Sequence, residues 1–212
     1  PFGYNSFHCN VTSLLNKDGK NNTLAVRLEN RPQSSRWYPG AGLYRNVHLI
    51  VTDKVHVPVW GTQITTPHVS KDFAAVRLQT KIDNAGEKTQ IRIETEILSP
   101  NGKVNHGQPF EQNFIVNAPE LWSPESPSLY KAVSKIYADD KLVDTYTTRF
   151  GIRSIEYIAD KGFYLNGKHR KFQGVCNHHD LGPLGAAINV AALRHQLTLL
   201  KDMGCDAIRT SH

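Results

Sequence analysis

The sequence contains no long apolar run, which argues against a membrane-spanning helix. No stretch of about 18 consecutive apolar residues occurs in the 212-residue chain. Residues Pro1 to Asn5 also lack the basic and apolar regions of a secretory signal peptide. We expect the chain to be cut from a larger protein, so the missing signal does not decide between a cytoplasmic and a periplasmic location.

Cysteine is scarce as well. The three cysteines, Cys9, Cys176 and Cys205, are widely separated and odd in number. This spacing predicts neither a disulfide framework nor a zinc-binding knuckle. We expect free, buried thiols.

The chain has a net charge of +6, which raises the question of a nucleic-acid partner. Basic residues, however, are interleaved with acidic ones, and the densest basic run is only the four residues Lys168 to Lys171. Such a short run in a predicted hairpin is typical of a solvated face. We therefore expect no nucleic-acid partner and no membrane partner.

Residues 54–150 have the clearest pattern. Val76, Leu78, Thr80 and Ile82 alternate with polar residues, and residues 90–98 alternate in the same way. This period of two predicts strands with one buried and one wet face. With evenly spaced turns, about seven short strands are expected, which is typical of an immunoglobulin-like β-sandwich.

Residues 1–53 predict three further strands, at 7–11, 24–28 and 46–51. The loop at 34–45 combines aromatic and arginine side chains with Pro and Gly, so we expect an ordered loop that binds a ligand or braces a neighbouring domain. Arg36 and Trp37 are candidate sugar-binding residues, although Trp37 is equally compatible with a place in a domain core. Trp60 and Trp122 are expected in the sandwich core.

Residues 151–212 predict a hairpin, from strands at 155–158 and 162–165, followed by the turn residues Asn166 and Gly167. Strands at 172–175 and 206–210 flank a helix that begins after Asn189 as N-cap and ends near Gly204. Its expected apolar face is Leu193, Leu197 and Leu200. This order predicts one βαβ unit of a parallel barrel.

Titratable side chains follow both of these strands. His178, His179 and Asp180 come after the first, and His212 comes after the second. Active sites of (β/α)8 barrels lie at the carboxyl ends of the strands, so these residues are candidates for contacts with a polar substrate. A loop-bracing role is the alternative. A metal site is less favoured, because the adjacent His178 and His179 point apart on a strand.

Six stretches resemble glycoside hydrolase family two, and they occur in the order that this family shows. They cover essentially the whole chain and comprise Ser35 to Val47, Leu121 to Pro124, Phe150 to Arg153, Phe163 to Lys168, Gly174 to Asp180 and Ile208 to His212. The pattern is most similar to the β-galactosidase branch. The resemblance implies a mainly β chain made of part of a sugar-binding jelly roll (1–53), an immunoglobulin-like sandwich (54–150) and the first βαβ unit of a (β/α)8 barrel (151–212).

The resemblance further implies a retaining enzyme that cleaves terminal β-galactosides with two glutamates. Both glutamates lie on later barrel strands, so no catalytic residue is expected in this chain. His178 and His212 match family histidines that contact the sugar. Asp180 has no assigned counterpart. Some β-galactosidases have a sugar-contacting aspartate just before the tryptophan of this loop. In this chain, Ser35 and Arg36 occupy that position.

The implied partner is therefore a β-galactoside, and the whole protein is expected to form a homo-oligomer. No cofactor is expected in the chain, because the family's divalent-cation ligands fall beyond residue 212. Three alternatives remain open: a non-catalytic carbohydrate-binding or structural module, a β-glucuronidase or β-mannosidase specificity, and a metal-dependent barrel hydrolase.

Overall fold

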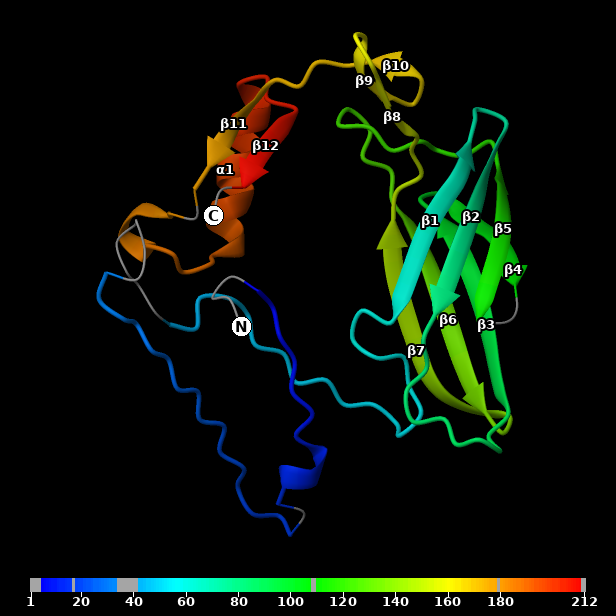
Figure 1. Ribbon diagram of the computed structural model, residues 1–212, viewed down its shortest axis with the longest axis vertical. Coiled ribbons are helices and arrows are strands. Elements are labelled where there is room, and N and C mark those ends of the chain that lie inside the picture. The colour runs from blue at the N-terminus through cyan, green and yellow to red at the C-terminus, as the bar shows by residue number, and fades with distance from the viewer. Residues whose placement is uncertain (1–4, 17, 34–41, 108–109, 179, 211–212) are drawn as a thin grey trace. The chain divides into compact units, whose positions relative to one another are not determined.

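The computed structural model describes residues 5–16, 18–33, 42–107, 110–178 and 180–210, with the strand at 102–107 described by its backbone. The chain forms two compact units. One combines the N-terminal residues up to Leu49 with those from Phe172 onward, and the other spans Ile50–Lys171. Figure 1 shows the helices and strands of both units.

The unit of residues 50–171 contains a β-sandwich. One sheet has the order β1-β2-β5 and the other the order β4-β3-β6-β7. The seven strands among the described residues are β1 (Thr62–Val69), β2 (Phe73–Thr80), β3 (Ile91–Ser99), β4 (Gly102–Gly107), β5 (Glu111–Asn117), β6 (Tyr130–Ala138) and β7 (Lys141–Phe150). Neighbouring strands are antiparallel throughout. The predicted immunoglobulin-like sandwich is confirmed.

Alternation of side chains explains why these segments become strands. In β2, Val76, Leu78 and Thr80 are buried, whereas Arg77 and Gln79 are exposed. The inward residues of β5 alternate in the same way, and the register places Val76 opposite Phe114. Each strand therefore removes one face from water and keeps the other face solvated.

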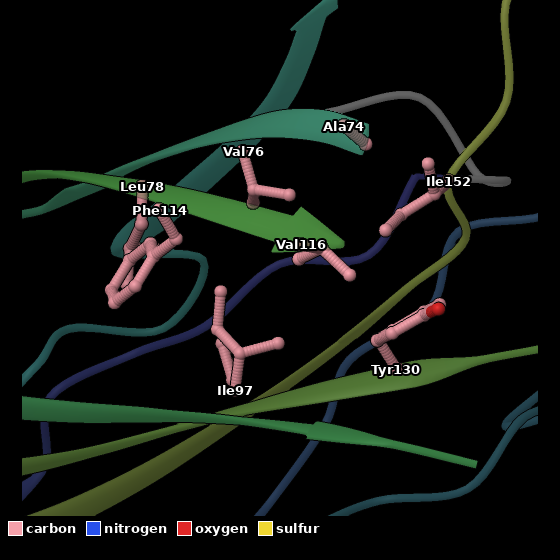
Figure 2. Close-up of a cluster of buried hydrophobic side chains, with 9 residues drawn as sticks. Ala74, Val76, Leu78, Ile97, Phe114, Val116, Tyr130 and Ile152 are labelled. Carbon is pink, nitrogen blue, oxygen red and sulfur yellow. The ribbon is translucent and has the colours of Figure 1, made fainter. Parts of the chain in front are cut away.

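The inward side chains meet in one core. Figure 2 shows Val76, Phe114 and Val116 facing Ile97 and Tyr130 across the space between the sheets. The full cluster comprises Ala74, Val76, Leu78, Ile97, Phe114, Val116, Tyr130, Ala132 and Ile152. Removal of this apolar area from water stabilises the sandwich by roughly 25 cal/mol per Å².

The two tryptophans predicted for the core behave differently. Trp60 is 64% exposed, so its prediction is wrong. It occupies a turn closed by the Gly61 N–H donating to the Pro58 carbonyl, and its φ of 60° directs the chain out of a strand path. Trp122 is half-buried and packs on Gly151, where a Cβ would lie 3.0 Å from the Trp122 Cβ.

A small three-stranded sheet follows the sandwich in the same unit (Figure 1). Its order is β10-β9-β8, with strands β8 (Ile155–Ile158), β9 (Gly162–Leu165) and β10 (Lys168–His169). Asn166 and Gly167 have φ values of 52° and 73° between the paired residues Leu165 and Lys168. These values fit a two-residue type I′ turn. The predicted hairpin and its turn dipeptide are confirmed.

The second unit contains the βαβ elements. They are β11 (Gly174–Asn177), the 3-10 turn η2 (Gly182–Leu184), α1 (Val190–Asp202) and β12 (Ala207–Thr210), and a further 3-10 turn η1 lies at Thr12–Leu14. β11 and β12 pair in parallel, so the predicted unit is confirmed. The predicted strand bounds of 172–175 and 206–210 are off by up to two residues.

The three strands predicted at 7–11, 24–28 and 46–51 do not form, which corrects this part of the sequence analysis. Phe7, Leu24 and Leu49 remain largely exposed. A strand depends on a hydrogen-bonded partner and on cover for its apolar face, and the described residues offer neither to these segments. The jelly-roll assignment of residues 1–53 stays a prediction, as do the domain limits at 53 and 150.

The cysteines are free, as expected, but not buried. Cys9 and Cys176 are exposed and Cys205 is half-buried. Cys176 belongs to the open face of the short β11–β12 pair, where no second layer covers it among the described residues.

We expect Ile97→Ala to destabilise the sandwich by about 2–5 kcal/mol, because it leaves a cavity at a fully buried position. The matched control is Ile115→Ala on the outer face of β5, where the side chain is 49% exposed, with an expected change below about 1 kcal/mol. Urea unfolding of both variants measures the difference. Equal losses would contradict the assignment of the two faces.

The ion pair between Arg170 and Glu125 should make stability depend on acid pH. Their atoms approach to 2.7 Å. The Arg170 guanidinium, followed by hydrogen bonds from the backbone of Glu125 and from the Ser123 side chain, lowers the pKa of Glu125 from 4.5 to about 2. Because the folded-state pKa is depressed, the stabilisation is present above pH 4.5 and is lost as the pH falls toward 2.

Glu125→Gln should therefore lower the unfolding free energy near neutral pH, and the difference from wild type should shrink through this acid range. Urea titrations at several pH values measure it. Glu87→Gln, in the exposed turn before β3, is the control. A pH-independent difference at Glu125 would disprove the ion-pair explanation.

Candidate functional site

The candidate site is built on the parallel pair of β11 and β12. The register places Val175 opposite Ile208 and Asn177 opposite Thr210, so both strands end at the same edge. His178 follows β11 directly and is exposed. The structure therefore places an imidazole at the carboxyl end of a barrel-type strand, as predicted. His179 and His212 lie outside the described residues.

Two residues that the sequence analysis did not single out hold this pair together. Gly174 lies so close to β12 that a Cβ would stand 2.3 Å from the Ala207 carbonyl oxygen. At the same end, the Asp206 carboxylate accepts a hydrogen bond of 2.8 Å from the Gln173 N–H. The Asp206 N–H donates in return to the Gln173 carbonyl at 2.9 Å. A glycine inside a predicted strand was the available signal.

Asp180 has a local structural contact. Its carboxylate accepts a hydrogen bond of 2.8 Å from the Gly182 N–H at the start of η2. This is an Asx-type turn, in which the side chain shapes the loop that follows the strand. Asp180 thus braces the loop beyond His178, and its contact with a substrate stays a prediction.

A further polar contact lies on the exposed face of the pair. Cys176 and Arg209 are register partners, and an Arg209 guanidinium N–H donates to the Cys176 Sγ at 3.7 Å. Alternation along β11 makes Gly174 and Cys176 more exposed than Val175 and Asn177. A guanidinium therefore stands on the open face, at the strand pair that ends in His178.

The crossover helix has defined ends. The Asn189 side chain accepts from the Ala192 N–H at 3.0 Å, which confirms the predicted N-cap. At the other end, Gly204 has φ 97° and donates to the Lys201 carbonyl, while Cys205 donates to Leu200. These two bonds form a Schellman motif. Of the predicted apolar face, Leu193 and Leu200 are half-buried and Leu197 is exposed.

Arg36 and Trp37 lie outside the described residues, so their predicted sugar contact is untested. The chain just beyond them reaches the βαβ region of the same unit. The Tyr44 carbonyl accepts a hydrogen bond of 2.9 Å from the Ile188 N–H, immediately before α1. The end of the predicted loop at 34–45 therefore contacts the segment between β11 and the helix.

The described residues contain no group of three or more His, Cys, Asp or Glu side chains placed to hold a metal ion. None of the helices in the described part of the chain has the length and apolarity needed to cross a membrane. Among the described residues, this edge offers the imidazole of His178, a loop braced by Asp180 and the guanidinium of Arg209 on the same strand pair.

Comparison with protein families identifies the chain. The description "Glycosyl hydrolases family 2" matches residues 56–153, and "Glycosyl hydrolases family 2, TIM barrel domain" matches residues 157–212. The first range contains the sandwich, and the second contains the last two residues of β8, the strands β9 and β10, and the βαβ unit. The chain belongs to glycoside hydrolase family 2 and comprises its immunoglobulin-like domain and the start of its barrel.

Two curated relatives carry different names. The chain is 41% identical to the protein named beta-galactosidase BoGH2A of Bacteroides ovatus over 100% of its own length and 26% of that protein. It is 40% identical to a putative beta-glucuronidase of Formosa agariphila, again over its full length but 21% of the relative. The chain thus spans about a quarter or less of these relatives.

Solved structures agree on the fold. A beta-glycosidase from Bacteroides vulgatus superposes with a TM-score of 0.78 and 37% identity, over 84% of this chain and 24% of that one. A beta-glucuronidase from Bacteroides uniformis gives a TM-score of 0.67 and 27% identity, over 76% of this chain and 22% of that one. Both named specificities therefore occur among the similar proteins.

Gly174→Ala should loosen the β11–β12 pair, because the added methyl group meets the backbone of Ala207. Overpacking of this kind costs about 1–3 kcal/mol. Amide hydrogen exchange at Ile208 and Arg209 should become faster by one to two orders of magnitude, consistent with about 1.4 kcal/mol per factor of ten. The control is Gly42→Ala, where a Cβ meets nothing within 4 Å. Unchanged exchange in the Gly174 variant would refute the close approach.

Proposed function

We propose that this chain forms part of a retaining glycoside hydrolase that cleaves terminal β-galactosides. The observation that carries the proposal is His178 at the carboxyl end of β11, within the range that matches the family's barrel domain. Family membership supports a carbohydrate substrate, and the 41% identity to a protein named beta-galactosidase favours galactose. The alternative is a β-glucuronide, favoured by the similarly related protein named putative beta-glucuronidase.

In this proposal the two catalytic carboxylates come from parts of the enzyme outside these residues. Retaining glycosidases use a pair of carboxyl groups about 5–5.5 Å apart, one as nucleophile and the other as acid and then base. His178 and His212 donate hydrogen bonds to sugar hydroxyls. We propose that these bonds are stronger in the transition state than in the ground state, so they accelerate the reaction more than they tighten binding.

The other candidate residues have supporting roles. Asp180 keeps the loop after β11 in place through Gly182. Arg36 and Trp37 belong to the predicted loop at 34–45. Its last residues include Tyr44, whose carbonyl accepts from the Ile188 N–H, and we assign Arg36 and Trp37 to the wall of the sugar site. Trp37 supplies a flat apolar surface for a pyranose face. A non-catalytic carbohydrate-binding role of the whole protein is the remaining alternative.

Specificity is tested in the enzyme that contains this chain, with p-nitrophenyl β-galactoside and p-nitrophenyl β-glucuronide under identical conditions. We expect kcat/KM to favour the galactoside by at least about a hundredfold, since a site built for one polar group rejects the analogue that lacks it. A preference for the glucuronide would overturn the galactosidase assignment and keep the family assignment. No hydrolysis of any glycoside would favour the binding-module alternative.

His178→Ala in the same enzyme should lower kcat. The activation free energy should rise by about 2–4 kcal/mol, the range for losing one preorganised donor. KM should change much less. The melting temperature should stay within a few degrees of wild type, because His178 is exposed. A stable variant with normal kcat would remove His178 from the site. His195→Ala, on the exposed side of α1, is the matched control.

A further inference from the structure

A cleft of about 600 Å³ lies within the unit of residues 50–171. Four segments form its walls: the turn between β1 and β2, the segment Leu121 to Glu125 that precedes β6, residues 154–156 at the start of β8, and the hairpin of β9 and β10. Its volume falls in the range of about 300–1,000 Å³ typical of small-molecule sites. No residue of the β11–β12 edge lines it, so it is a feature that the proposed function does not use.

Aliphatic side chains give the cleft an apolar component. Leu165 at the end of β9 is 7% exposed, and Leu121 and Val69 are half-buried beside the sandwich core. These side chains pack against the interior, so their positions are fixed by the fold. An apolar wall suits one face of a sugar ring, whose hydroxyl groups point toward the edge.

The walls are held by specific polar contacts. Asn166 accepts from the Ser154 N–H at 3.0 Å and donates to the Trp122 carbonyl at 3.1 Å, which ties the hairpin to two other segments. Arg170 donates to Glu125 at 2.7 Å across the cleft wall, and its side chain is only 19% exposed. The cleft is therefore preorganised, which limits the entropic cost of binding.

The charges that remain available in the cleft are predominantly positive. The carboxylate of Glu125 is neutralised by Arg170, which leaves Glu156 as the other acidic lining residue. Lys71 and Lys168 line the cleft from two different segments, and neither forms an ion pair with another described residue. His169 adds a further hydrogen-bonding group at the same hairpin. An anionic group is thus attracted by two ammonium groups against one carboxylate.

From these features we infer that the cleft binds an acidic saccharide unit, a pyranose that carries a carboxylate. The ring lies on Leu121 and Leu165, its hydroxyl groups meet the serine hydroxyls of the walls, and its carboxylate contacts Lys71 and Lys168. The ligand binds without a covalent step. The inference is independent of the proposed function, since it concerns binding by the sandwich unit and not hydrolysis at the barrel strands.

The test uses the 212-residue chain and two probes that differ at one carbon, methyl β-D-glucuronide and methyl β-D-glucoside. Methyl NMR signals of Leu121 and Leu165 report occupancy of the cleft. We expect the glucuronide to shift these signals and to bind at least about fivefold more tightly than the glucoside, the effect of an exposed charge contact of about 1 kcal/mol. Lys71→Ala and Lys168→Ala should each weaken glucuronide binding by about the same factor.

Lys161→Ala in the exposed β8–β9 turn, which does not line the cleft, is the matched control and should leave binding unchanged. His178→Ala should also have no effect, which separates this site from the proposed active-site edge. Absence of shifts at Leu121 and Leu165 would overturn the inference. Three other results would also overturn the inference. They are equal binding of the two probes, equal losses of binding in Lys161→Ala and Lys168→Ala, and loss of binding in His178→Ala.

Discussion

The packing of two sheets face to face is the constraint on which this structure depends. β2 and β5 turn Val76, Leu78 and Phe114 toward the inward side chains of β3 and β6, and few other described residues are as deeply buried. Ile152 extends this core beyond β7, the last strand of the sandwich. Because Ile152 also accepts the Trp122 N–H through its carbonyl, the core positions the segments that lead to the small β8–β10 sheet. The cleft beside that sheet exists because those segments are fixed.

The βαβ unit is organised on a different principle. No residue of α1 is buried, and the strands β11 and β12 have only four residues each. Its order comes mainly from hydrogen bonds: the Asn189 cap, the Schellman bonds at Gly204 and the two bonds between Asp206 and Gln173. The close backbone approach at Gly174 adds to them. Hydrogen bonds of this kind contribute about 1 kcal/mol each, whereas core burial contributes through many contacts together. A functional edge built in this way is sensitive to single backbone changes.

Much of the fold could be predicted because it follows local patterns. The alternation in β2 and β3, the turn at Asn166 and Gly167, and the cap at Asn189 are each readable within a few residues. The strands expected near Phe7, Leu24 and Leu49 were wrong, although their apolar patterns were similar to those of the sandwich strands. A strand pattern gives only the tendency to pair, and pairing needs a partner that the local sequence does not reveal.

The sequence by itself determined the sandwich, the βαβ order and the presence of histidines after two strands, because periodicity and turn chemistry act over short distances. Tertiary structure decided the rest. It determined that Trp60 faces solvent, that Gly174 touches Ala207, that Asp180 bonds to Gly182, and that Lys71 and Lys168 share one cleft. Lys71 and Lys168 are far apart in the chain, and only the packing of the hairpin against the sandwich brings such residues together.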